Sequence, residues 1–207
     1  MKLWPSFIGM LLAVVSSFTS AGGEQQRLIE LLEPLASSTG QFKQITKDAS
    51  DAVIQSSEGT FAIQQPGKFM WRTSAPYEQL LVSDGQTIWL YDPDLEQVTI
   101  KPASGQKDQL PIRILSGDFD LLGSEFSIQS GAATGSQQVF SLRPLAPGSL
   151  TNIDLVFDGS QLVAMHVQDA SKTVTQFEFV GRRDLTTQDE AQFKFQIPEG
   201  ADVFYDE

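Results

Sequence analysis

The chain has 207 residues, with 26 acidic and 14 basic side chains and a formal net charge of −12. A surface this acidic repels nucleic acid and anionic membrane faces, which disfavours nucleic acid as a partner. The absence of cysteine excludes a disulfide framework and an N-terminal lipid anchor, so a hydrophobic core must stabilise the fold alone.

The first 22 residues predict a secretory signal peptide. A positive start is followed by a mostly apolar stretch and then by small and polar residues, with Ala21 or Gly22 as the expected last residue removed. The apolar stretch is too short to span a bilayer. We therefore expect an exported chain in which residues 23–207 form one domain that stays in solution.

Residues 24–38 predict an amphipathic helix. Apolar residues recur at spacings of three and four, as at Leu28, Leu32 and Leu35. Pro34 is expected to kink the helix or end it early, because proline removes a helical hydrogen bond. Such a helix either covers a core or forms a movable lid, and the pattern by itself favours the cover.

From Gln41 onward, apolar and polar residues alternate, which predicts β-strands. Four pairs of apolar residues mark the first strands: Phe61/Ile63, Phe69/Trp71, Leu80/Val82 and Trp89/Tyr91. Asp84-Gly85 and Asp158-Gly159 each separate two such segments and predict tight hairpins.

Residues 101–120 interrupt the strand pattern. Within them, the stretch Leu110-Pro-Ile-Arg-Ile-Leu-Ser predicts a short helix with Pro111 in its first turn. Ile112 and Leu115 would then lie on one face of that helix. Strands are expected again near residues 126–128, 139–142, 153–157, 162–167, 174–180, 193–197 and 202–205.

About ten or eleven short strands with tight turns predict a mainly β fold. The expected architecture is a strongly curved antiparallel sheet or open barrel, in place of alternating strands and helices. A closed eight-stranded barrel is filled by its own side chains, whereas more strands leave room inside. The many phenylalanines at alternating positions therefore form either an ordinary core or, in part, the wall of a cavity.

The sequence contains no residue set that favours catalysis. His166 is the one histidine and lies in a predicted strand, and neither a nucleophile nor an orienting carboxylate can be assigned to it. Asp92, Asp94 and Glu96 lack the glycine-turned loop of a calcium site and are interpreted as turn-capping residues. We expect no metal and no cofactor, and an exported hydrolase that uses His166 is the weakest alternative.

Several stretches resemble the outer-membrane lipoprotein carrier family, LolA. The specific ones are Gly67-Lys-Phe-Met-Trp-Arg, Leu80-Leu-Val-Ser-Asp-Gly-Gln-Thr-Ile-Trp-Leu-Tyr and Asp92-Pro-Asp-Leu-Glu-Gln-Val-Thr. A looser likeness covers Leu110-Pro-Ile-Arg-Ile-Leu-Ser-Gly and the segment that begins at Phe193. Together they span most of the chain in order.

This resemblance implies an incomplete β-barrel of about 11 strands, with a helical lid over a hydrophobic cavity. It also implies a monomeric periplasmic carrier that accepts the acyl chains of lipoproteins from an inner-membrane ABC-type releasing complex and passes them to the outer-membrane receptor LolB. The implied cavity residues are Phe61, Phe69, Trp71, Trp89 and Tyr91, and the implied lid residues that face the ligand are Leu28, Leu32, Ile112 and Leu115.

One position departs from the family pattern. The family commonly has an arginine directly before Pro-Gly, where it bonds lid carbonyls and keeps the empty carrier closed, but this chain has Gln65. An amide still donates two hydrogen bonds, although they lack charge assistance. We therefore expect a more weakly latched lid. The departure also favours the alternative of a carrier with the same fold for another amphiphile, such as a glycolipid or a fatty acyl intermediate.

Overall fold

The computed structural model describes residues 21–104, 110–132 and 135–206. The first described element, α1 (Ala21–Leu32), begins at the predicted cleavage point, and residues 1–20 of the predicted signal peptide lie outside the described part. Removal of residues 1–22 stays a prediction. No helix in the described ranges is long and apolar enough to cross a bilayer.

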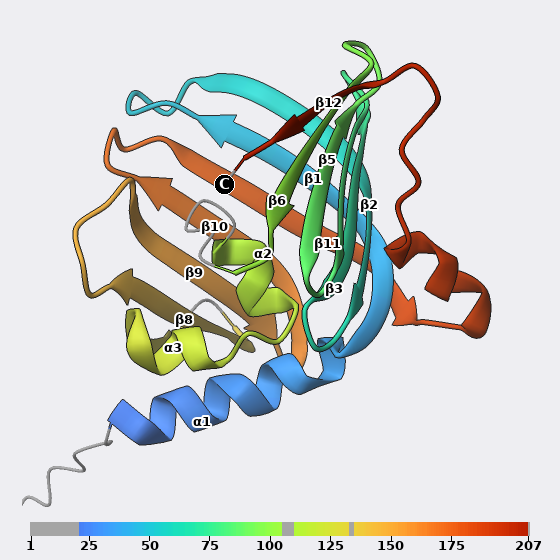
Figure 1. Ribbon diagram of the computed structural model, residues 1–207. Helices are drawn as coiled ribbons and strands as arrows, with labels where there is room; N and C mark the ends of the chain where they lie inside the picture. The colour runs from blue at the N-terminus through green and yellow to red at the C-terminus, as the bar shows by residue number, and fades with distance from the viewer. Residues whose placement is uncertain (1–20, 105–109, 133–134, 207) are drawn as a thin grey trace, which may run out of the picture.

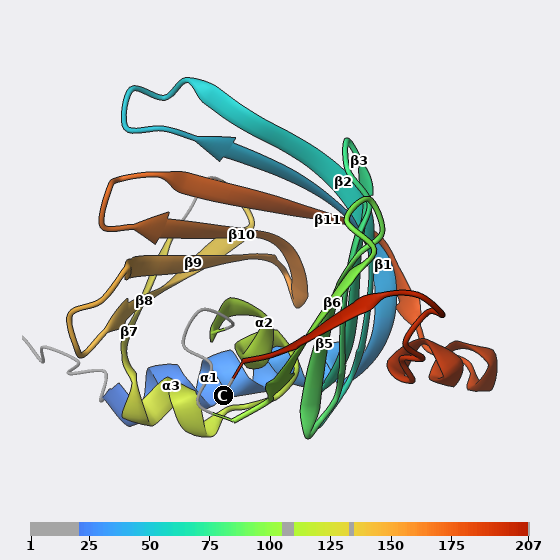
Figure 2. The ribbon, with the colours of Figure 1, turned by 45° about the horizontal axis from the view of Figure 1, so that its top comes forward.

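Twelve strands form one strongly curved sheet, in the order β12-β6-β5-β4-β3-β2-β1-β11-β10-β9-β8-β7 (Figures 1 and 2). The strands are β1 (Ser37–Lys47), β2 (Val53–Gln64), β3 (Lys68–Ala75), β4 (Gln79–Asp84), β5 (Thr87–Asp92), β6 (Gln97–Pro102), β7 (Phe126–Ala132), β8 (Gln137–Pro144), β9 (Leu150–Asp158), β10 (Gln161–Asp169), β11 (Val174–Asp184) and β12 (Asp202–Tyr205). Among these described strands, only β12 and β6 pair in parallel. The predicted curved, incomplete barrel is confirmed, with one strand more than expected.

The hairpins at Asp84-Gly85 and Asp158-Gly159 are confirmed, since β4 pairs with β5 and β9 with β10. At the first, the Asp84 carboxylate accepts hydrogen bonds from the backbone N–H groups of Gln86 and Thr87, at 2.9 and 2.8 Å. Gly85 adopts a φ of 96°, a conformation that glycine takes without steric cost.

Helices close the base of the barrel and enter its opening. As expected, Pro34 ends the first helix early: α1 passes into the 3-10 turn η1 (Glu33–Leu35), and β1 begins at Ser37. In Figure 2, α2 (Leu110–Leu115) lies inside the curve of the sheet. A short helix that the sequence pattern did not predict, α3 (Asp120–Ser124), follows it.

The concave face carries the main core. Buried residues of α1, including Leu28 and Leu32, pack in one cluster with Phe140, Leu155 and other residues of the sheet. At about 25 cal/mol per Å² of apolar surface, such side chains each stabilise the fold by roughly 2 kcal/mol. The buried face of α1 therefore packs against the concave side of the sheet at the base of the barrel.

A close backbone approach at Gly59 accompanies the curvature of the sheet. A β-carbon there would lie 1.9 Å from the backbone oxygen of Arg72 on the neighbouring strand. The pairing of β2 with β3 shifts register at this point, which is typical of a strand that bends. Any larger residue at position 59 is thus expected to push the two strands apart.

A second, smaller apolar cluster lies on the convex face. It joins Ala62, Met70 and Val82, from three neighbouring strands, to Phe193. The segment that covers these strands is the 3-10 helix η3 (Thr187–Phe193), seen outside the sheet in Figure 1. The predicted strand at residues 193–197 is therefore wrong: Phe193 ends a helix, and residues 194–198 belong to no helix or strand.

Asp189 holds the covering segment in place. The Arg183 guanidinium bonds both of its carboxylate oxygens, at 2.9 and 3.0 Å, and the N–H and hydroxyl of Thr186 each donate to it at 2.8 Å. These groups, the arginine first, hold the pKa of Asp189 well below its ordinary value of 3.8. Ionised Asp189 therefore stabilises the folded chain at neutral pH, and this contribution begins to decrease as the pH falls below about 4 and is lost as the pH passes through the lower pKa of the folded chain.

We expect Asp189→Asn to lower the free energy of unfolding at pH 7 and to have a moderately smaller effect at pH 3, where the carboxyl is protonated in the unfolded chain but still ionised in the folded chain. Urea unfolding of both proteins at the two pH values measures the difference. Glu190→Gln, an exposed change in the same helix, is the control. An Asp189→Asn effect of equal size at both pH values would contradict the assignment.

Candidate functional site

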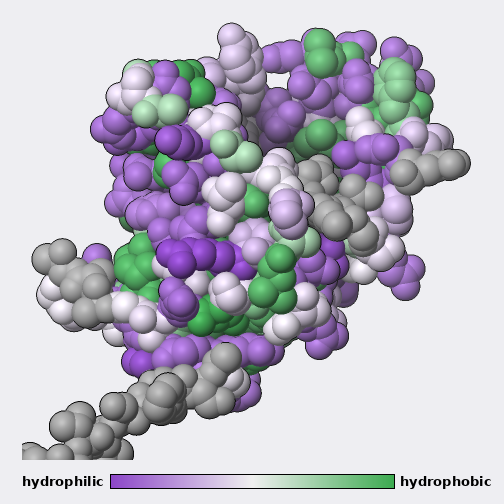
Figure 3. Space-filling model, turned by 90° about the vertical axis from the view of Figure 1, so that its left-hand side faces the viewer, coloured by the Kyte–Doolittle hydropathy of each residue, from purple (hydrophilic) through white to green (hydrophobic). Residues whose placement is uncertain are grey.

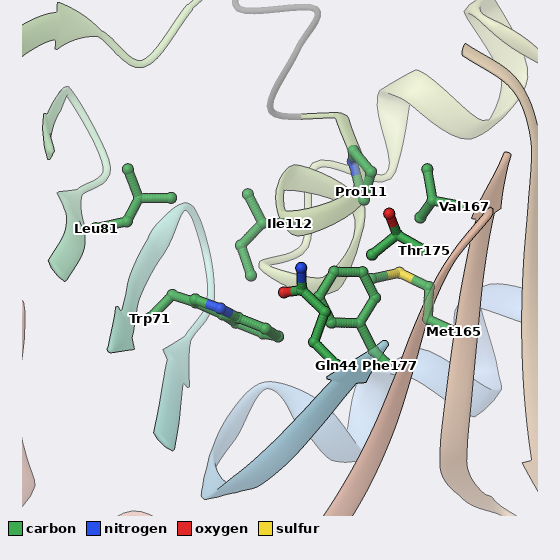
Figure 4. Close-up of a pocket in the computed structure, with 9 residues that line it drawn as sticks. All are labelled: Gln44, Trp71, Leu81, Pro111, Ile112, Met165, Val167, Thr175 and Phe177. Carbon is green, nitrogen blue, oxygen red and sulfur yellow. The ribbon is translucent and has the colours of Figure 1, made fainter. Parts of the chain in front are cut away.

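An apolar pocket of about 250 Å³ lies between the concave face of the sheet and helix α2. Its walls combine side chains of β1, β3, β4, β10 and β11 with the first turn of α2 (Figure 4). The lining residues are Gln44, Trp71, Leu81, Pro111, Ile112, Met165, Val167, Thr175 and Phe177. Two of the nine, Gln44 and Thr175, are polar, and the pocket is otherwise suited to an apolar ligand.

Trp71 is the centre of an aromatic group at the pocket wall. Its ring stacks on Phe42 at a centroid distance of 4.0 Å and meets the edge of Phe177 at 5.5 Å. Phe61 lies on the next strand at 6.1 Å from Trp71. The rings of Phe42, Phe61 and Phe177 thus pack around Trp71 in stacked and edge-on arrangements and form one continuous aromatic wall.

The predicted cavity residues do not all reach this pocket. Trp71 lines it, whereas Phe61 lines a much smaller void of about 10 Å³ and Phe69 lines a separate recess at the base. Trp89 and Tyr91 point to the opposite face, where both rings pack on Phe195 at 6.1 and 5.9 Å. Their placement in the cavity wall is therefore corrected.

The register explains the correction. Trp89 is paired with Val82, and Val82 with Met70, so all three side chains share the convex face. The concave neighbours in the same strands include Trp71 and Leu81. Alternation correctly groups Trp89 with Tyr91 on one face of β5, but the face is the outer one.

The predicted lid residues are all buried, in different surroundings. Ile112 lines the pocket, Leu115 lines the small void beside Phe61, and Leu28 and Leu32 are buried in the main core. Of the two helices, α2 covers the pocket directly. That these four residues face a bound ligand stays a prediction.

Gln65 contacts the covering helix, as the resemblance implies for this position. Its side-chain amide donates a hydrogen bond of 3.2 Å to the backbone oxygen of Leu115. The backbone N–H of Gly67 donates to the oxygen of Ser116 at 2.9 Å, so the turn also holds α2 through the main chain. A latch at Gln65 would therefore add one neutral hydrogen bond to a contact that is already present.

We expect Gln65→Arg to slow the uptake of an acylated ligand. A charged donor strengthens the bond to the helix by about 1 kcal/mol, or about fivefold in the ratio of closed to open carrier. Stopped-flow fluorescence with an acyl probe measures the rate. Gln86→Arg, the same change in an exposed hairpin, is the control, and equal rates for wild type and Gln65→Arg would refute the latch.

Several pocket residues escaped prediction. Met165 and Val167 flank the histidine of their strand, and Phe177 alternates with Phe179, so the period of two was a usable signal for all three. Gln44 and Thr175 gave no such signal because they are polar.

His166 is not arranged as a hydrolytic relay with the serine and the aspartate of the neighbouring strands. Along the ladder of β8, β9 and β10, Ser141 is opposite Asp154 and Asp154 is opposite His166. Ser141 donates directly to the Asp154 carboxylate, at 2.6 Å. Since a relay requires the imidazole between the hydroxyl and the carboxylate, this order does not support a serine nucleophile.

The fold and the pocket define the class: an open-barrel protein with an apolar interior covered by a short helix. Residues 33–196 match the family model described as outer membrane lipoprotein carrier protein LolA. The chain belongs to this family.

Curated relatives and solved structures agree with that assignment. Over 198 residues the chain is 38% identical to the outer-membrane lipoprotein carrier protein of Azotobacter vinelandii, covering 94% of this chain and 95% of that protein. For the protein of the same name from Chromohalobacter salexigens the identity is 34%, with coverages of 97% and 95%.

A crystal structure of an outer membrane lipoprotein-sorting protein domain from Vibrio parahaemolyticus is similar, with a TM-score of 0.51 at 13% identity, and covers 84% of this chain and 97% of that one. An uncharacterized conserved protein from Thermus thermophilus gives a TM-score of 0.54 at 14% identity, with coverages of 87% and 98%. At such identities the likeness shows the fold alone.

Proposed function

We propose that this protein is a periplasmic chaperone that binds the acyl chains of lipoproteins released from the inner membrane and carries them to an outer-membrane receptor. The observation that carries the proposal is the apolar pocket between the aromatic wall at Trp71 and the helix residue Ile112, in a chain that belongs to the LolA family. The predicted signal peptide supports the periplasmic location.

The pocket must enlarge to take such a ligand. Its volume of about 250 Å³ lies below the range of roughly 300–1,000 Å³ that is usual for small-molecule sites, and a lipoprotein carries more than one long chain. The main core joins the sheet and α1 to Ile112, Ile114 and Leu115 of α2, but α2 has only six residues and forms one wall of the pocket. We therefore assign the opening movement to α2.

Energetics require that the ligand pass directly between apolar sites. Burying one acyl chain of about 16 carbons is worth roughly 12 kcal/mol, at about 0.8 kcal/mol per methylene group. Several chains together exceed the practical limit of about 20 kcal/mol for non-covalent affinity, so release into water is too slow to be useful. This supports two partners, an inner-membrane ABC-type complex that supplies the lipoprotein and a receptor such as LolB that accepts it.

Depletion of the protein in its source cell tests this function. We expect outer-membrane lipoproteins to accumulate at the inner membrane, as fractionation and immunoblotting would show. Normal sorting would refute the proposal. Re-expression of the wild-type chain is the control for indirect damage to the envelope.

The departure at Gln65 favours one second candidate, a carrier of the same fold for a different amphiphile such as a glycolipid. Native mass spectrometry of protein purified from the periplasm separates the two. Bound acylated peptide supports the lipoprotein carrier, and free lipid with no acylated peptide supports the second candidate.

A further inference from the structure

A second cavity adjoins the apolar pocket at Gln44, which lines both. It has a volume of about 500 Å³ and is bordered by the turns that join β3 to β4 and β5 to β6. We call it the upper chamber. In Figure 4 the amide of Gln44 lies beside the ring of Phe177, at the boundary of the apolar pocket.

The concave face changes in polarity along the strands that build the two cavities. On β2, the positions that share this face run from Phe61 through Gly59 to Ser57 and Gln55. On β3 they run from Trp71 to Thr73. Trp71 lines the apolar pocket and Phe61 lines the small void of about 10 Å³, whereas the polar members line the upper chamber.

The chamber lining favours ligands that accept hydrogen bonds and carry no negative charge. Amides and hydroxyls line it at Gln55, Ser57, Thr73 and Gln79, and such groups bond ester and amide carbonyls. The charged residues that line it are all acidic. Figure 3 shows the side of the molecule that lies to the left in Figure 1, and mainly hydrophilic residues surround the hollow near its top.

The three carboxylates of the chamber have different partners. Glu78 is paired with Arg72, which reduces its field. Asp92 accepts a hydrogen bond of 3.2 Å from the backbone N–H of Leu95. Asp94 lies in the same turn. The chamber therefore repels anionic groups mainly through Asp92 and Asp94.

We propose that the upper chamber is a binding subsite for the polar stem of an acylated polypeptide. The stem consists of the ester and amide carbonyls next to the acyl chains and the first peptide residues, which the subsite accepts when they are neutral or basic and disfavours when they are acidic. Gln44 is the positioning donor at the boundary. This inference rests on the proposed acyl-carrier function.

Two synthetic probes test it with the purified protein: dipalmitoylglyceryl-cysteine followed by serine and either four lysines or four glutamates. We expect the lysine probe to bind about tenfold more tightly at low salt and the preference to vanish at high salt, because exposed charges are screened. Isothermal titration with both probes measures this.

Two variants locate the effect. The double variant Asp92→Asn, Asp94→Asn is expected to abolish the preference, and asparagine at position 92 can still accept the turn hydrogen bond. Gln55→Leu, at a residue that lines the chamber and not the apolar pocket, is expected to weaken both probes about fivefold without changing the affinity for palmitoyl alcohol, which has no stem. The control, Asp184→Asn with Glu190→Gln, removes two exposed carboxylates on residues that do not line the chamber.

The outcomes separate this inference from the function on which it rests. Equal affinity for both probes at low salt, or a preference that survives in the Asp92, Asp94 variant, would overturn the subsite while leaving the acyl carrier intact. Failure of both probes and of palmitoyl alcohol to bind would overturn the carrier function and the subsite together.

Discussion

Trp71→Leu is expected to weaken acyl-chain binding about tenfold or more, whereas Trp89→Leu should leave it nearly unchanged. The two tryptophans lie on nearby strands of one sheet, but Trp71 lines the pocket and Trp89 packs on the convex face against Phe195. Loss of an aromatic contact of about 1.5 kcal/mol corresponds to the tenfold change. Titration with a fluorescent acyl probe measures both affinities.

This pair of variants controls for stability. Each substitution removes a partly buried indole, so we expect both to lower the free energy of unfolding by about 2 kcal/mol. Urea unfolding identifies the fraction folded under the binding conditions. If the two variants lost equal affinity, the convex face would share the binding function, and the division of the sheet into two faces would be wrong.

Phe140→Ala is expected to lower the free energy of unfolding by about 3–5 kcal/mol, the usual result of emptying a buried aromatic site. Phe140 is fully buried, meets the edge of Phe157 at 5.9 Å and lies 6.0 Å from the Arg27 guanidinium. Thermal and urea unfolding measure the loss. Phe204→Ala, at a side chain that is 51% exposed, should change stability by no more than about 0.5 kcal/mol.

The Phe140 variant should retain binding wherever it remains folded, because Phe140 does not line the apolar pocket. Its effect thus differs in kind from that of Trp71→Leu, which acts on the ligand directly. A Phe140→Ala protein that is as stable as wild type would show that the β8–β9 half of the sheet is loosely packed.

The fold was largely predictable because its signals are local. Period-two alternation and the Asp-Gly turns identify strands that pair with their sequence neighbours, as at Asp84-Gly85. The error at Phe193 and Phe195 has a physical cause: an apolar residue at every second position fits a strand and also fits a segment that covers an apolar face.

The site was only partly predictable, since alternation does not say which face of a sheet is inside. Both faces here carry buried clusters, so Trp71 and Trp89 give the same pattern for opposite environments. The contact of Gln65 with α2 joins residues 50 positions apart, and it was expected only through the family resemblance. The presence of Gln44 and Thr175 in the pocket follows from the register in which β1 pairs with β11, and composition does not encode that register.

We expect the main-chain hydrogen bond from Gly67 to Ser116 to influence how the carrier loads its ligand. This bond does not depend on any side chain. It therefore still holds one end of α2 when the hydrogen bond from the Gln65 amide to Leu115 is broken. The next residue, Gly117, has a φ of 92° and can change conformation at little steric cost. Loading should therefore occur at the rate of a hinge rotation and not at that of helix unfolding.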